Sequence, residues 1–157
     1  MRGEPMASVY VETSIFGSLV ERRRDVTSRY QREEATAWWE FRDRYDLYIS
    51  QAVINELSAG SYPGQELALR LASIVPQLEI TEEIRALSKD YRRLMIMPDR
   101  EVGDALHLAT ACVYGVDYLV TWNCKHLANV NKTERLLAIH AQLGRPMPRI
   151  VTPPMLE

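Results

Sequence analysis

The stretch VGDALHLATACVYGVDYLVTWN, Val102–Asn123, decides the fold of this chain. From Ala105 to Val113 every residue except a histidine and a threonine is apolar, which is typical of a helix buried inside a domain. Gly115 is well placed to end that helix, because glycine readily adopts the left-handed conformation that closes helices. Residues 118–121 form a short, β-prone and largely apolar run, which is typical of a central parallel strand. The sequence therefore predicts a buried helix followed by a buried strand.

Strand-like and helix-like segments alternate along the rest of the chain. Short apolar runs predict further strands at 8–11, 47–49, 78–80 and 149–151. Helical spacing and capping residues predict helices at 21–46 (with its entry loop), 51–59, 63–75, 81–95 and 131–144. The first long helix is expected to bury Tyr30, Glu34, Ala37, Trp38, Phe41 and Tyr45. Without a linker or repeat, this alternation predicts one domain, residues 1–157 with a core at about 8–151, on a parallel α/β sheet of four to five strands.

The composition fits a globular domain in a reducing compartment. The chain has 157 residues, 46% of them hydrophobic, and a formal net charge of −2. This near-neutral total neither indicates nor excludes nucleic-acid binding, because a local basic patch such as Arg22–Arg24 can exist within it. No run approaches the roughly 18 apolar residues of a membrane span, and no apolar signal core precedes the first acid. The sequence thus predicts no membrane association and no secretion, and its two cysteines indicate no disulfide framework, as in the cytoplasm.

Three acids and one amide occupy equivalent places in successive strand–helix units. Glu12 follows the first strand, and Glu56 lies on the helix after the second strand. Asp104 opens the buried helix, and Asn123 follows the next strand. Ligands of open α/β sheets bind at the carboxyl ends of the strands, so we expect these four side chains to converge.

A divalent cation is the natural neutraliser for such a group. Carboxylates gathered in a protein interior repel one another and are costly to desolvate. Oxygen ligands without a cysteine or histidine cluster suit Mg²⁺ or Mn²⁺ better than Zn²⁺. A site of this kind can bind a phosphodiester, generate hydroxide and stabilise the leaving oxygen.

The segments around these residues resemble a known family. VYVETSIF, ISQAVINEL, GDALHLATA and YLVTWNCKHLAN are similar, in this order, to the four motifs of PIN-domain nucleases, and most closely to the VapC-type toxins of prokaryotic toxin–antitoxin pairs. The resemblance extends from about Val9 to about Ile150. It implies a doubly wound, three-layer α/β/α sandwich and metal-dependent cleavage of single-stranded or structured RNA. It also implies a homodimer and a small antitoxin protein that blocks the site.

The resemblance assigns roles to the four residues and also exposes two departures. Glu56 and Asp104 match the family's glutamate and central aspartate, whereas Glu12 stands where the family usually has an aspartate, and Asn123 where a fourth acid is common. Glu12 keeps the charge but moves it outward by one methylene, and Asn123 keeps an oxygen but loses a charge. We therefore expect Glu12 and Asp104 to hold one Mg²⁺ or Mn²⁺ ion rather than two, with weak or manganese-preferring activity.

Neighbouring polar residues admit both a structural and a functional interpretation. Hydroxyl groups near the expected site can support the ligands or act as plain caps; these belong to Thr13, Ser14 and Thr121. His107 lies three residues after Asp104 on one helix face, so it can hydrogen-bond a ligand carboxylate, touch a phosphate, or be a satisfied core histidine.

The residues after Asn123 are expected to contact substrate, not to attack it. Lys125 and His126 can contact the RNA backbone. A nearby cation can activate a thiol, but no second histidine or cysteine motif supports Cys124 as a nucleophile. Asp117 precedes its strand and so belongs to the opposite edge of the sheet, where a structural role is expected.

The sequence thus predicts a metal-dependent endoribonuclease whose catalytic residues are Glu12, Glu56, Asp104 and Asn123. The alternative is a catalytically attenuated PIN-like protein that binds RNA or a partner without cleavage, which the two departures favour. A phosphotransfer domain or haloacid-dehalogenase-type hydrolase also places an acid after its first strand. Those proteins need an aspartate there as phosphoryl acceptor, and Glu12 is a poor substitute.

Overall fold

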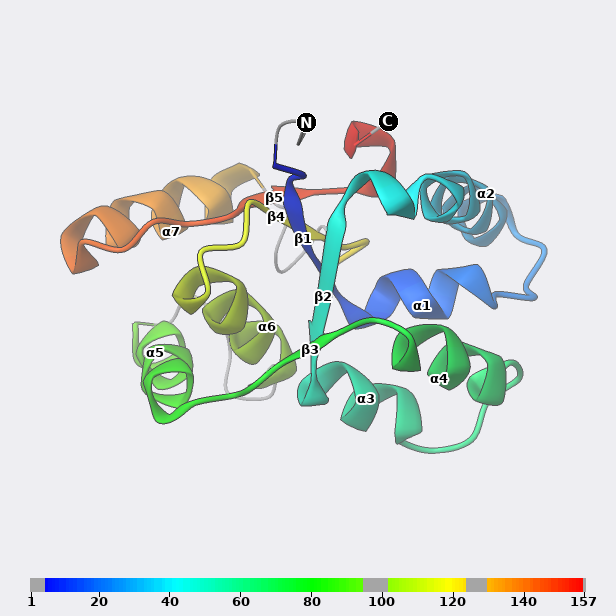
Figure 1. Ribbon diagram of the computed structural model, residues 1–157, viewed down its shortest axis with the longest axis horizontal. Helices are drawn as coiled ribbons and strands as arrows, with labels where there is room; N and C mark the ends of the chain where they lie inside the picture. The colour runs from blue at the N-terminus through cyan, green and yellow to red at the C-terminus, as the bar shows by residue number, and fades with distance from the viewer. Residues whose placement is uncertain (1–4, 95–101, 124–129, 157) are drawn as a thin grey trace.

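The fold is built on a five-stranded parallel sheet with strand order β3-β2-β1-β4-β5 (Figure 1). A computed structural model of the chain describes residues 5–94, 102–123 and 130–156. The strands are β1 (Ser8–Val11), β2 (Asp46–Ser50), β3 (Gln77–Leu78), β4 (Tyr118–Val120) and β5 (Arg149–Val151). Five parallel strands agree with the predicted four to five.

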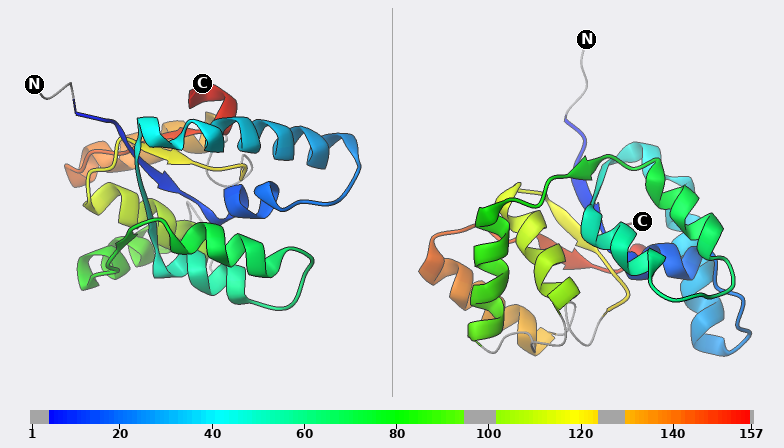
Figure 2. Two further views of the ribbon diagram at one scale, coloured as in Figure 1. Left: turned by 45° about the vertical axis from the view of Figure 1, so that its right-hand side comes forward. Right: turned by 90° about the horizontal axis from the view of Figure 1, so that it is seen from below.

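Helices cover both faces of the sheet. One side carries α1 (Thr13–Leu19), α2 (Val26–Glu40), α3 (Gln51–Ser58) and α4 (Gln65–Ser73), and the other carries α5 (Glu82–Arg93), α6 (Val102–Val113) and α7 (Val130–Leu143) (Figures 1 and 2). This arrangement confirms the three-layer, doubly wound α/β/α sandwich. No helix in the described ranges is long and apolar enough to span a bilayer.

The stretch Val102–Asn123 forms the expected buried helix and strand. Ala105, Leu108, Ala109 and Ala111 of α6 are fully buried. Gly115 ends this unit with a φ of 66°, a left-handed conformation that glycine adopts without strain. Strand β4 then pairs in parallel with β1 on one side and β5 on the other.

The predicted helix at 21–46 is wrong in its length and in part of its buried face, although Trp38 is buried as expected. Asp25 caps α2, which ends at Glu40, and a short 3₁₀ helix at Arg42–Arg44 leads into β2. Tyr30 and Phe41, both expected inside, are exposed. The buried residues of α2 are Ser28, Ala35, Trp38 and Trp39. Small residues let the helix approach its neighbours closely, and hydrophobic spacing alone does not identify such positions.

Other predicted boundaries shift by a few residues. The third strand is Gln77–Leu78, not 78–80. The helix predicted at 63–75 begins at Gln65 because Gly64 precedes it with a φ of 84°. Helix α7 begins at Val130, one residue before the predicted start. The expected tail after β5 is a 3₁₀ helix, Pro153–Leu156, which packs on α2.

Candidate active site at the carboxyl edge of the sheet

The predicted site residues gather where the order of strands reverses. Strand β1 pairs with β2 on one side and β4 on the other, so the chain leaves β1 and β4 at adjacent points of the same edge. Glu12 follows β1 directly, and its backbone N–H donates to the Val120 carbonyl at 3.1 Å. Such switch points are where open α/β sheets bind ligands.

Glu12 ties the ends of these two strands together. It is 4% exposed and caps α1, with Oε2 accepting from the Ser14 backbone N–H at 3.1 Å. Its Oε1 accepts from the hydroxyls of Ser14 at 2.5 Å and Thr121 at 2.6 Å. The longer side chain therefore folds back onto the start of α1, which is how the structure accommodates glutamate in place of aspartate.

Glu56 is held by a chain of hydrogen bonds that begins in the core. His107 Nε2 hydrogen-bonds Glu56 Oε1, and Thr13 Oγ donates to the same oxygen at 2.8 Å. The opposite ring nitrogen, His107 Nδ1, lies 2.6 Å from the Tyr10 hydroxyl, which lies 2.7 Å from Ser50 Oγ. The carboxylate of α3 is thus connected through α6 to β1 and to the end of β2.

The charges of the three acids converge on His107, whose side chain is fully buried. Burial alone would lower the pKa of His107, but the Glu56 hydrogen bond and the charges of Glu56, Glu12 and Asp104 raise it above its ordinary value. For Glu56, burial would raise the pKa, but His107 and Thr13 lower it. The contact between His107 and Glu56 thus favours the charged form of each group.

Asp104 and Asn123 also contact one another. Asn123 Nδ2 donates to Asp104 Oδ2 at 2.9 Å, and the Asn123 backbone N–H donates to Thr121 Oγ at 2.8 Å. The asparagine that replaces an acid thus orients the Asp104 carboxylate through its amide N–H. All four predicted catalytic residues lie at this edge, and so do Thr13, Ser14, His107 and Thr121. Lys125 and His126 lie outside the described residues, as does Cys124.

Three further residues support the site and were not predicted from the sequence. Tyr10 and Ser50 continue the hydrogen-bond chain behind His107. At Gly103 a Cβ would lie 2.7 Å from Glu56 Oε2, so a larger residue there would displace the Glu56 carboxylate from its present position. The available signals were a tyrosine inside an apolar strand and a glycine directly before Asp104, but neither identifies its partner.

The donor chemistry of the edge fits a hard divalent cation. Glu12, Glu56 and Asp104 offer carboxylate oxygens, which Mg²⁺ and Mn²⁺ prefer. Among residues 5–94, 102–123 and 130–156, no group of three or more His, Cys, Asp or Glu side chains is placed to hold a metal ion. The carboxylates accept hydrogen bonds from hydroxyl, imidazole and amide groups, and partners of this kind orient carboxylates that bind a metal ion.

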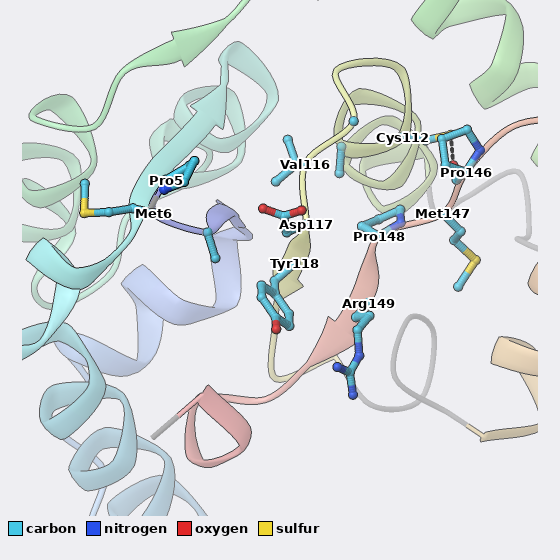
Figure 3. Close-up of a pocket in the computed structure, with 13 residues that line it drawn as sticks. Pro5, Met6, Cys112, Val116, Asp117, Tyr118, Pro146, Met147, Pro148 and Arg149 are labelled. Atoms are coloured by element: carbon cyan, nitrogen blue, oxygen red, sulfur yellow. Dashed lines mark hydrogen bonds between the residues drawn. The ribbon is translucent and has the colours of Figure 1, made fainter. Parts of the chain in front are cut away.

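A hollow of about 620 Å³ lies at the opposite edge of the sheet from the candidate active site (Figure 3). It is lined by residues next to the starts of β1, β4 and β5, among them Asp117. Asp117 accepts hydrogen bonds from the Ser8 backbone N–H at 2.9 Å and the Ser8 hydroxyl at 3.0 Å. The structural role predicted for Asp117 is confirmed.

Solved structures with a similar fold have low sequence identity to this chain. A toxin–antitoxin complex from Klebsiella pneumoniae aligns with a TM-score of 0.58 at 20% identity over 92% of this chain and 97% of that chain. VapBC2 from Rickettsia felis, bound to a DNA fragment from its promoter, aligns with a TM-score of 0.60 at 14% identity, over 92% of this chain and 98% of that chain. DNA-bound VapBC from Salmonella typhimurium aligns with a TM-score of 0.57 at 15% identity, over 94% of this chain and 99% of that chain.

Sequence comparison identifies the family. No curated protein is similar enough to this chain to count as a match. The family model of the PIN domain matches residues 9–131, which include all four predicted catalytic residues. The match covers most of the chain and agrees with the observed fold. This chain therefore belongs to the PIN domain family.

Proposed function

We propose that the protein is a metal-dependent endoribonuclease and the toxin of a toxin–antitoxin pair. The observation that carries the proposal is that Glu12, Glu56 and Asp104 all lie at the strand-reversal edge. Hydrogen bonds through Thr121 and Asn123 link Glu12 to Asp104, and His107 and Thr13 hold Glu56. Membership of the PIN domain family and the likeness in fold to toxin–antitoxin complexes support the same reaction class.

Each residue has a distinct role in the proposed reaction. Asp104 and Glu12 would hold one Mg²⁺ or Mn²⁺ ion, and Asn123 orients Asp104. The bound cation would polarise the scissile phosphodiester and help to ionise water. Because the pKa of Glu56 is lowered, this group stays ionised and is a weak base, so it is suited to orient the attacking water. His107 fixes the Glu56 carboxylate.

The decisive experiment replaces the central aspartate. We expect Asp104→Ala to abolish Mn²⁺-dependent cleavage of a labelled RNA while the circular dichroism spectrum and melting temperature stay close to the parent. The matched control is Asp43→Ala, an exposed aspartate in the 3₁₀ helix after α2, which should cleave like the parent. Unchanged cleavage by Asp104→Ala would refute the assignment.

A second candidate function is binding of RNA or a partner without cleavage. The observation in its favour is that the Glu12 carboxylate already accepts three hydrogen bonds from Ser14 and Thr121. If this attenuation is real, Glu12→Asp combined with Asn123→Asp should raise cleavage sharply. The alternative fails if the parent is already as active as this double variant.

The proposed toxin role includes partners. We propose a homodimer that acts on RNA in the cytoplasm and is inhibited by a small antitoxin protein. A small reading frame beside this one should encode a protein that co-purifies with the chain and suppresses its RNA cleavage. Light scattering of the free protein should report the mass of two chains. A stable monomer that retains full activity would contradict the dimer.

A further inference from the structure

A groove of about 610 Å³ leads away from the candidate active site along α1. Its lining includes Ser14 and Gly17 of α1, Arg22 and Arg23 of the loop after α1, and Tyr62 of the connection between α3 and α4. We name it the α1 groove. Ser14 also donates to Glu12, so one end of the groove is continuous with the acidic edge.

Gly17 keeps the α1 groove open. It lies inside a helix of seven residues, where glycine is unfavourable relative to alanine. Its φ is not positive, so any residue can adopt this backbone conformation, and a Cβ at this position would meet nothing within 4 Å. Neither backbone conformation nor packing therefore requires glycine here. A side chain would project into open space that belongs to the groove.

The far end of the groove is positively charged. Arg22, which lines the groove, and Arg24, which lies beside it in the loop and outside the lining, are exposed. Within the described residues no hydrogen bond or ion pair engages their guanidinium groups. Arg23 is 75% exposed and is paired with Glu21, whose carboxylate also accepts from two backbone N–H groups. The other acid of this loop, Asp25, caps α2. The loop thus presents a surplus of guanidinium groups whose acidic neighbours are already engaged.

This combination suits a phosphodiester strand. Arginine guanidinium groups bind phosphates, and they offset the repulsion that three carboxylates at the near end exert on a polyanion. A volume of about 610 Å³ lies in the range of ligand pockets. Tyr62, fixed by its hydroxyl to the Leu57 carbonyl at 2.7 Å, adds a rigid aromatic wall of the kind on which bases stack.

We propose that the α1 groove binds the single-stranded RNA that flanks the scissile bond, with its phosphates on Arg22 and Arg23. This inference rests on the proposed ribonuclease function, since it names how the substrate of that site is held. The lining holds two arginines against one acid, Glu21, whose carboxylate is already hydrogen-bonded. This balance favours an anionic occupant such as RNA over a hydrophobic peptide, and an acidic peptide is the competing outcome of the test.

The test measures RNA binding separately from cleavage. A fluorescein-labelled single-stranded oligoribonucleotide is titrated in EDTA with the parent, Gly17→Leu, Gly17→Ala and the double variant Arg22→Ala/Arg23→Ala. We expect Gly17→Leu and the arginine pair to weaken binding at least about tenfold, whereas Gly17→Ala stays within about twofold of the parent. The arginine pair should also lower the salt slope of log affinity by about 1.4, since each phosphate contact on a single strand contributes about 0.7.

Controls separate the groove from general charge and from misfolding. Arg85→Ala/Lys89→Ala removes two exposed cations from α5, on the other side of the sheet, and should keep parental affinity. Melting temperatures must stay close to the parent for all variants that are compared. If no protein cleaves RNA but the groove variants still lose binding, the proposed catalysis fails and the groove stands.

Two results would overturn the inference. One is a properly folded Gly17→Leu protein and an arginine double variant that bind RNA like the parent, or no worse than the α5 control pair. The other is that the groove variants keep parental RNA affinity but lose the parent's binding of a labelled poly-glutamate peptide. That result would make the groove a protein-docking site.

Discussion

His107 connects the hydrophobic core to the candidate active site. Its ring is buried between the Tyr10 hydroxyl and the Glu56 carboxylate. We expect His107→Gln, which keeps a hydrogen-bond donor but removes the charge, to lower kcat for RNA cleavage about tenfold or more while KM changes little. Steady-state kinetics on a labelled RNA would measure both constants. If kcat stays at the parental value and only KM rises, His107 acts in substrate binding instead.

The same residue makes stability depend on pH. Because the folded-state pKa of His107 is raised, its contribution is complete below its unfolded pKa of about 6.5 and is lost as the pH rises through the folded value. Glu56 has a lowered pKa, so its contribution is present above its unfolded value and is lost as the pH falls through the folded one. Urea denaturation should show the parent losing more stability than His107→Gln above pH 6.5. Parallel profiles for the two proteins would contradict the ion pair.

The sequence identified the residues that carry charge at this edge but not those that position them. Glu12 and Asp104 could be predicted because one follows a strand and the other opens a helix, and Glu56 because it lies on the helix after the second strand. Tyr10 and Gly103 could not, since their importance arises from contacts with His107 and Glu56 that are distant in sequence. Asn123 was expected to offer an oxygen, whereas its amide N–H faces Asp104.

At the scale of elements, Gly64 determines how α4 meets the end of α1. Its φ is 84°, and a Cβ would lie 2.9 Å from the Val20 Cβ. Gly60, with a φ of 67°, has nothing within 4 Å of its would-be Cβ and provides a matched comparison. We expect Gly64→Ala to destabilise the protein by about 1–3 kcal/mol more than Gly60→Ala, because backbone strain is similar at both sites and only Gly64 adds a clash.

Urea denaturation of the two glycine variants at constant slope would measure that difference. Equal losses of stability would mean that Val20 moves aside without cost.

The buried face of α2 illustrates the same dependence on neighbours. Its residues Ser28 and Ala35 are buried because other elements approach them closely, while the larger Tyr30 stays half-exposed beside Trp122. Sequence periodicity records hydrophobicity but not how close a neighbour comes.

At the scale of the whole molecule, the number of strands and their parallel direction could be predicted from the sequence, because parallel strands are buried on both faces and alternate with helices. Runs such as Ser8–Val11 and Tyr118–Val120 are short and apolar, and they follow one another with helices between them. Helix lengths and exact starts depended on local features such as Gly64 and Asp25. The fold therefore followed from the pattern of burial, whereas the boundaries followed from single residues.

The charge of the whole site predicts how many cations the protein binds. Glu12, Glu56 and Asp104 supply at most three negative charges, fewer than the four positive charges of two divalent ions. A second ion would leave uncompensated positive charge in a partly buried site, which is costly.

Isothermal titration of the metal-free protein with Mn²⁺ should therefore give one tight site, and Asp104→Asn should lose it. At a hundredfold excess over the dissociation constant, that ion should stabilise the parent by about 2.7 kcal/mol and raise its melting temperature. Two tight sites in the free protein, or equal stabilisation of Asp104→Asn, would contradict a single cation held by this edge.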